Sequence, residues 1–313
     1  MHEFNLIHQY FTWDNQPDDI LIAVGDDAAV LDLPKDKQLV TSIDTLISGV
    51  HFPKSTAPRA VGHKALAVNL SDLAAMGAEP KWFTLALTLP TIDTVWLEEF
   101  SAGLKSLAQQ HQCFLIGGDT TRGPLSISIQ VMGFVDQGRA LLRSGAKLGD
   151  KIYVSGTLGD AAAGLQNILG ELSLSEDDAV FCQKKLNIPT PRIRESKKLK
   201  TFASACIDIS DGLLQDLSHI LRASKMGANL DLSALPFSPV LKKLDKKQAQ
   251  QLAFSGDDYE LLFTVPEDKE ALLLETMDSK VSCIGHITNE CGKIIDESGK
   301  ELNATGYNHF NDN

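Results

Sequence analysis

Apolar and polar positions in the first half of the chain follow both strand-like and helix-like periods. Residues 125–135 alternate polar and apolar side chains, which predicts a strand. Helical patterns occupy residues 3–13, 58–76 and 94–110, and strands are also predicted at 38–43, 82–89 and 113–116. Pro58 and Gly77 stand where a helix typically begins and ends. The first half therefore indicates an α/β domain.

The second half repeats this mixture after a segment of different composition. Residues 138–150 are rich in glycine, arginine and lysine, and we expect them to link a first domain, 1–137, to a second, 151–313. In the second domain Ser210 is expected to cap a helix over 211–226. The other predicted elements are strands at 151–155, 205–209, 260–265 and 281–287, and helices after residue 160, at 191–203 and near 267–277.

Composition narrows the class of protein. Of the 313 residues, 43% are hydrophobic and 22% charged, as expected for a folded protein with a large core. The formal charge of −12 argues against nucleic-acid binding, which needs a basic face. The chain shows neither a signal peptide nor an apolar run of the ~18 residues that span a membrane. The five cysteines form no CxxC, so we expect reduced thiols in a cytoplasmic protein.

Aspartates recur beside glycine or inside apolar runs. Any one such motif is better explained as an ordinary turn or helix cap. Together they indicate converging carboxylates, because a carboxylate in an apolar setting is disfavoured unless it is paired or binds a metal. The five motifs are Gly25-Asp26-Asp27, Ser42-Ile43-Asp44, Asn69-Leu70-Ser71-Asp72, Gly117-Gly118-Asp119 and Asp208-Ile209-Ser210-Asp211-Gly212.

Oxygen ligands of this kind fit Mg²⁺ and, through it, phosphate groups. The chain has no P-loop, dinucleotide-binding glycine motif, zinc spacing or GxSxG nucleophile motif. Arg143, in a flexible cationic segment, fits a nucleotide phosphate and a solvated surface position equally well. The residues alone predict a Mg²⁺-dependent enzyme acting on a nucleotide or a phosphate ester. The candidate ligands are Asp27, Asp44, Asp72, Asp119, Asp208 and Asp211.

The motif set resembles the thiamine-monophosphate kinases, within the superfamily of aminoimidazole ribonucleotide synthetase-like ATP-binding proteins. The matching segments occur in order along nearly the whole chain, and SDLAAMGA together with GGDTTRGP is specific. They are GDDAA (25–29), SIDTLISGVHF (42–52), KALAVNLSDLAAMGAEP (64–80), FTLALTLP (83–90), LIGGDTTRGP (115–124), GRALLRSGAKLGD (138–150), IDISDGLLQDLSHI (207–220), SGDDYELLF (255–263) and GYNHF (306–310).

The resemblance implies a two-domain α/β (α+β) fold whose N-terminal sheets pair in a homodimer. It implies direct in-line transfer of the ATP γ-phosphoryl group to thiamine monophosphate, giving thiamine diphosphate, with several Mg²⁺ ions. Asp44, Asp72 and Asp119 are the implied catalytic residues. The implied Mg²⁺ ligands are Asp27, Ser42, Asp44, Asp72, Asp119, Asp208 and Asp211; Gly118, Asp119, Arg143 and Ser210 would contact ATP; His51, Asp257 and Tyr307 would hold thiamine monophosphate.

Two kinds of alternative compete with this assignment. Selenophosphate synthetase-like and hydrogenase-maturation relatives use a reactive cysteine near one terminus, whereas the first cysteine here is Cys113 and the chain ends at Asn313. A calcium-binding protein would show dense DxDxDG spacing, whereas these aspartates are dispersed. The chain departs from the family pattern at Ile43, where threonine is frequent, and at Asp257 in a shortened SGDDYEL segment.

Overall fold

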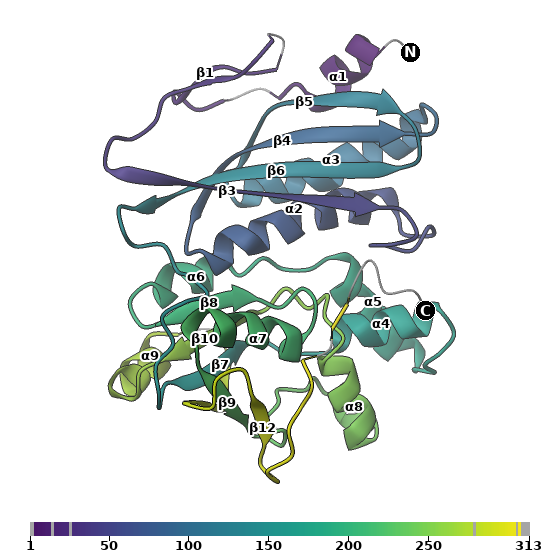
Figure 1. Ribbon diagram of the computed structural model, residues 1–313. Coiled ribbons are helices and arrows are strands. Elements are labelled where there is room, and N and C mark those ends of the chain that lie inside the picture. The colour runs from purple at the N-terminus through teal and green to yellow at the C-terminus, as the bar shows by residue number, and fades with distance from the viewer. Residues whose placement is uncertain (1–2, 14–15, 25–26, 278–279, 305, 308–313) are drawn as a thin grey trace. The chain divides into compact units, whose positions relative to one another are not determined.

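The computed structural model describes residues 3–13, 16–24, 27–277, 280–304 and 306–307, and they form an α/β protein (Figure 1). The chain divides into two compact units. Unit 1 comprises Met1–Leu73 and Ala78–Arg139, and unit 2 comprises Ala74–Gly77 and Ala140–Asn313. Each unit contains its own sheet and its own helices. No helix in the described ranges is long and apolar enough to cross a membrane.

Unit 1 is built on a four-stranded sheet in the order β3-β6-β4-β5. β4 and β5 run parallel, and the other neighbours run antiparallel. β3 lies at an edge and pairs with β6 along its whole length. The strands are β3 (Lys37–Ile47), β4 (Glu79–Leu89), β5 (Phe114–Arg122) and β6 (Ser126–Asp136); β1 (Ile20–Ile22) and β2 (Val30–Leu31) form a separate pair.

The helices of unit 1 are α1 (Glu3–Phe11), α2 (Pro58–Ala75) and α3 (Thr94–Gln110), with α2 and α3 on one face of the sheet (Figure 1). α3 begins after Asp93, whose side chain accepts the N–H groups of Val95 and Trp96. α2 and α3 approach closely at two glycines. A Cβ atom on Gly103 would lie 1.9 Å from the carbonyl oxygen of Arg59, so this contact requires glycine.

Unit 2 is built on a six-stranded mixed sheet in the order β12-β9-β11-β7-β10-β8. Only β12 and β9 run parallel within this sheet. Its inner residues, including Ile152, Ile207 and Leu262, pack with Leu213 and Leu217 of α7 into one buried cluster. The strands are β7 (Lys151–Ser155), β8 (Ala205–Asp208), β9 (Gly227–Leu230), β10 (Leu261–Val265), β11 (Val281–Thr288) and β12 (Ile294–Asp296).

Six α-helices and two short 3₁₀ helices of the described chain accompany this sheet. They are α4 (Asp160–Ile168), α5 (Glu176–Asn187), α6 (Ile193–Leu199), α7 (Leu213–Ser224), α8 (Lys246–Ala253), α9 (Glu270–Thr276), η1 (Leu241–Lys243) and η2 (Glu267–Lys269). α4 and α5 touch where a Cβ atom on Gly164 would lie 2.5 Å from the carbonyl oxygen of Cys182. All five cysteines are free thiols.

The structure confirms several sequence predictions and corrects others. The helix over 94–110 and the strand over 151–155 have the predicted bounds, and α2 ends before Gly77, whose φ is +70°. The strand predicted over 38–43 is longer, so Asp44 lies within β3. The prediction that a strand ends at residue 116 is wrong, because pairing with β4 continues through Gly118. α5, α8 and β9 were not predicted.

We expect Gly103→Ala to lower the free energy of unfolding by about 1–3 kcal/mol, because the added methyl group forces two packed backbones apart. Differential scanning calorimetry measures the change. Gln109→Ala, at an exposed position of the same helix, is the control and should stay within about 0.5 kcal/mol of the parent. Equal stability of the Gly103→Ala variant and the parent would contradict the close approach of α2 and α3.

Candidate active site

In unit 1, β3 and α2 are joined at their acidic residues. Ser42 and Asp44 are two positions apart on β3 and therefore point to the same face. The Ser42 hydroxyl donates a hydrogen bond to Asp72 Oδ2 of α2 at 2.5 Å. The backbone N–H of Asp44 donates to Asn69 Oδ1 at 3.1 Å. Ser42, Asp44 and Asp72 are thus brought to one place, and their role as ligands of a common site stays a prediction.

Asn69 is the residue that fixes this junction. It is completely buried. Its Nδ2 donates to the carbonyl of Ala65 at 2.9 Å, and its Oδ1 accepts the N–H of Asp44. A buried amide is costly unless both ends are paired, and here both are. Asn69 and Asp72 are three positions apart on α2 and so share a face, but the sequence did not identify the strand partner of Asn69, 25 residues earlier.

Gly118 and Asp119 lie within β5, and both are exposed. A Cβ atom on Gly118 would lie 1.9 Å from the carbonyl oxygen of Leu85, so the parallel pairing with β4 requires glycine there. Asp119 follows at the next strand position and is displayed to solvent. β5 thus presents an acid from a rigid strand.

Asp27 and His51 lie outside the long strands of unit 1. Asp27 is exposed in the segment before β2, while Gly25 and Asp26 of the same motif lie outside the described residues. His51 is half-buried in the turn after β3, and its Nδ1 accepts the N–H of Ile47 at 2.9 Å.

In unit 2, Asp208 ends β8 and is 5% exposed. The predicted capping of the next helix by Ser210 is wrong, because α7 starts at Leu213 and no side chain caps its first turn. Instead Asp216, inside that turn, accepts the N–H groups of Asp211 and Gly212 at 3.1 Å each. Burial, with the nearby Asp211 carboxylate, raises the pKa of Asp216 to about 7.

The SGDDYE segment is bonded to the turn that follows β8. The N–H of Asp257 donates to the Ser210 carbonyl and that of Tyr259 to the Ile209 carbonyl, both at 2.8 Å. Asp257 has a φ of +66° and Tyr259 a φ of +52°, conformations that side-chain-bearing residues rarely adopt. The two backbone bonds stabilise this strained path and place Asp257 beside the Asp208–Asp211 turn.

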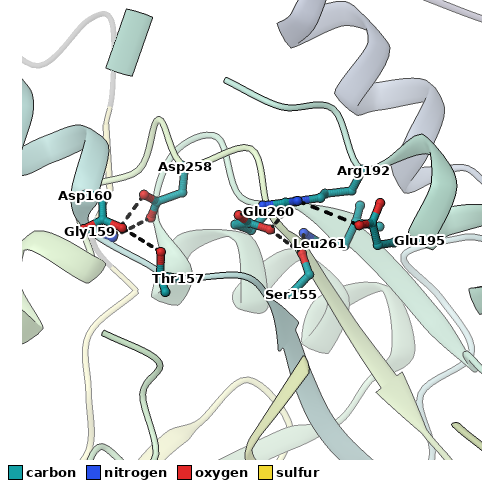
Figure 2. Close-up of polar contacts among 9 residues, drawn as sticks. All are labelled: Ser155, Thr157, Gly159, Asp160, Arg192, Glu195, Asp258, Glu260 and Leu261. Carbon is teal, nitrogen blue, oxygen red and sulfur yellow. Dashed lines mark hydrogen bonds and ion pairs between the residues drawn. The ribbon is translucent and has the colours of Figure 1, made fainter. Parts of the chain in front are cut away.

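Side-chain bonds anchor the same segment on its other side (Figure 2). Asp258 accepts the N–H of Gly159 with both oxygens, at 3.0 and 2.9 Å, and burial raises the pKa of its carboxyl well above the usual range. Glu260 is 3% exposed and accepts from Ser155 Oγ at 2.5 Å and from Arg192 Nε at 2.6 Å, with a second bond from Arg192 Nη2.

The pairing of Glu260 with Arg192 is not evident from the sequence. The one available signal was an acid, Glu260, immediately before a strand with four apolar residues out of five, a position where a carboxylate needs a partner. Its cationic partner Arg192 lies 68 residues away and could not be identified from spacing.

The remaining predicted residues of unit 2 also lie near α7. Tyr307 is 46% exposed, and its N–H donates to the Asp211 carbonyl at 3.2 Å. Arg143 is exposed, and its carbonyl accepts a bond from Ser224 Oγ at the end of α7. The hydrogen bond from Ser224 therefore fixes the backbone of Arg143 relative to α7.

No preformed cluster of three or more acid, histidine or cysteine side chains suitable for a metal occurs among the residues that the structure describes. The predicted ligands form two sets: Asp27, Ser42, Asp44, Asp72 and Asp119 belong to unit 1, and Asp208 and Asp211 belong to unit 2. Both sets consist of oxygen donors, which is the chemistry that Mg²⁺ prefers.

Comparison with known proteins gives matches along nearly the whole chain. The family model "AIR synthase related protein, N-terminal domain" matches residues 25–135, and "AIR synthase related protein, C-terminal domain" matches residues 147–297. The thiamine-monophosphate kinase of Haemophilus influenzae is 45% identical, with 99% of this chain and 98% of that protein covered.

Two solved structures are also similar over most of their length. The crystal structure of thiamine-monophosphate kinase from Stenotrophomonas maltophilia has a TM-score of 0.86 and 47% identity, covering 91% of this chain and 93% of that one. The structure of AaThiL complexed with AMPPCP and TMP has a TM-score of 0.81 and 34% identity, covering 92% of each chain.

We expect Arg192→Met to lower the free energy of unfolding by about 3–5 kcal/mol, because it leaves the Glu260 carboxylate buried without its cation. Calorimetry measures the loss. The double variant Arg192→Met/Glu260→Gln removes both charges and should recover part of it. A single variant as stable as the parent would show that the pair contributes little.

Proposed function

The chain belongs to the AIR synthase related family and, within it, to the thiamine-monophosphate kinases, and from this premise we propose how its residues divide the work of phosphoryl transfer. The chain has thiamine-monophosphate kinase activity, using ATP to convert thiamine monophosphate into thiamine diphosphate. We propose that the γ-phosphoryl group moves directly and in line, since such transfer needs positioning and charge neutralisation and no covalent nucleophile.

The observation that supports the site most directly is the junction of β3 and α2 at Ser42, Asp44 and Asp72. Rigid elements hold these oxygens, and all are donors suited to Mg²⁺. Bound Mg²⁺ supplies neutralisation of the phosphate charge. Asp44, Asp72 and Asp119 are the proposed catalytic residues. The proposed Mg²⁺ ligands are Asp27, Ser42, Asp44, Asp72, Asp119, Asp208 and Asp211.

The two substrates have different chemical requirements. Thiamine monophosphate carries a cationic thiazolium ring, which an acid and an aromatic face would bind. Asp257 is half-buried and Tyr307 is well exposed, so both suit this role, with His51 as the third proposed contact. For ATP, an exposed guanidinium at Arg143 suits a phosphate. Gly118, Asp119 and Ser210 complete the proposed ATP contacts.

We further propose that the N-terminal sheet pairs in a homodimer through β3. This 11-residue strand lies at the sheet edge and exposes Leu39, Ile43 and Ile47, which are 48%, 62% and 41% exposed. A long edge with apolar side chains is normally covered by another chain.

We also propose that residues 1–137 form the ATP- and Mg²⁺-binding domain, with 138–150 as linker and 151–313 as second domain.

A product assay tests the proposed site. The protein is incubated with ATP, Mg²⁺ and thiamine monophosphate, and chromatography follows thiamine diphosphate and ADP. We expect equal amounts of both products, and none after a chelator is added. Asp72→Asn should lower turnover by more than roughly 100-fold. Replacing a residue that only supports a metal ligand already costs roughly 10–100-fold in metal affinity or activity, and Asp72 is itself a proposed ligand.

Asp36→Asn, at an exposed turn of the same unit, is the matched control and should behave as wild type. Thermal unfolding of both variants checks that the fold is retained. Near-normal turnover by Asp72→Asn, or full activity in the chelator, would overturn the metal assignment. Substitution of Ca²⁺ for Mg²⁺ should stall the enzyme, whereas a calcium-binding protein would tolerate it.

Light scattering after size-exclusion chromatography tests the dimer. We expect the mass of two chains for the wild type and of one chain for Leu39→Glu, because a charge at the strand edge opposes pairing. Leu142→Glu, at an exposed position in unit 2, should leave the mass unchanged. A wild-type mass of one chain would contradict the proposal.

A further inference from the structure

Gln215 lies in the first turn of α7, four residues after Asp211, and is half-buried. Its Nε2 donates to Asp211 Oδ2 at 3.0 Å and to the carbonyl oxygen of Tyr307 at 3.2 Å. One amide group therefore joins the turn after β8 to Tyr307, which lies 92 positions after Gln215 in the chain.

Residues 306–307 are also held by their backbone at this point. The N–H of Tyr307 donates to the Asp211 carbonyl at 3.2 Å. A Cβ atom on Gly306 would lie 2.6 Å from Gln215 Oε1 and 2.7 Å from the Asp211 carbonyl oxygen. Only glycine lets the chain pass so close, so residues 306–307 are seated against the turn at a defined place.

The chemistry of the partners fixes the orientation of the Gln215 amide. A carboxylate and a carbonyl are both acceptors, so the NH₂ group must face them. A glutamate at this position would direct oxygens at two acceptors and add a charge beside Asp211. A methionine would keep the length of the side chain and remove both bonds.

We propose that Gln215 is a positioning residue that sets Tyr307, and through it the binding of thiamine monophosphate, relative to the Asp211 turn. This rests on the proposed role of Tyr307 in binding that substrate. Gln215 itself contacts the protein and no reacting atom. Gln215 affects the affinity for thiamine monophosphate because it fixes the backbone of Tyr307, and that backbone determines where the aromatic ring lies.

Steady-state kinetics test the consequence for the substrate. Gln215→Met should raise the KM for thiamine monophosphate roughly 5- to 30-fold, since it removes both hydrogen bonds of the Gln215 amide. The KM for ATP and kcat should change less, and Gln215→Glu should have the larger effect. Gln110→Met, at an exposed position of α3, is the control and should match wild type.

A double-mutant cycle separates positioning from general damage. If Gln215 acts through Tyr307, Gln215→Met should add little to the KM of a Tyr307→Ala variant. Independent effects of the two substitutions would overturn the proposal. So would a Gln215→Met variant whose KM for thiamine monophosphate is unchanged while the wild type turns over normally, and that result leaves the proposed function intact.

Hydrogen exchange tests the docking without relying on activity. The backbone amide of Tyr307 should exchange faster in Gln215→Met than in the wild type. Its own hydrogen bond to the Asp211 carbonyl remains, but the bond from Gln215 to the Tyr307 carbonyl is lost. Equal exchange rates overturn the proposal. Faster exchange in a protein that makes no thiamine diphosphate shows that the docking is correct and that the proposed function, with the substrate role built on it, has failed.

Discussion

Removing a carboxylate from water costs several kcal/mol unless hydrogen bonds or a cation replace the lost solvation. Unit 2 buries Asp160, Asp216 and Glu260 almost completely, and each has such partners. Asp160 accepts from Thr157 and Ser238, Asp216 from two backbone N–H groups, and Glu260 from an arginine and a serine. These three acids are thus hydrogen-bonded to the protein itself, and they shape the loops.

The acids left half-buried are of a different kind. Asp211 and Asp257 lie on loops that the buried acids hold, and their carboxylates remain open to solvent in part. In unit 1 the same separation holds between Asn69, which is fully buried, and Asp44, which it supports. Each chemical group is therefore placed by a second group that takes no part in binding, which is how rigid sites are generally built.

Local patterns predicted what depends on near neighbours. The bounds of α3 follow from its periodicity and from Asp93, and the end of α2 follows from Gly77. The aspartate motifs, taken together, predicted that acids converge, and the structure brings Ser42 and Asp72 of two such motifs into contact. The anchor at Glu260 and the tie at Gln215 could not be predicted, since their partners are 68 and 92 residues away. The extension of β5 through two glycines also depended on a neighbouring strand.

The left-handed backbone at Asp257 and Tyr259 limits how this segment can vary. Branched side chains such as valine, isoleucine and threonine are strongly disfavoured in that conformation, whatever ligand the protein is asked to bind. The need to fold therefore restricts the residues allowed at positions 257 and 259, independently of any requirement for substrate binding. A library randomised at residue 257 to alter specificity would therefore lose its β-branched members to poor folding, and glycine, asparagine and aspartate would be the best tolerated there.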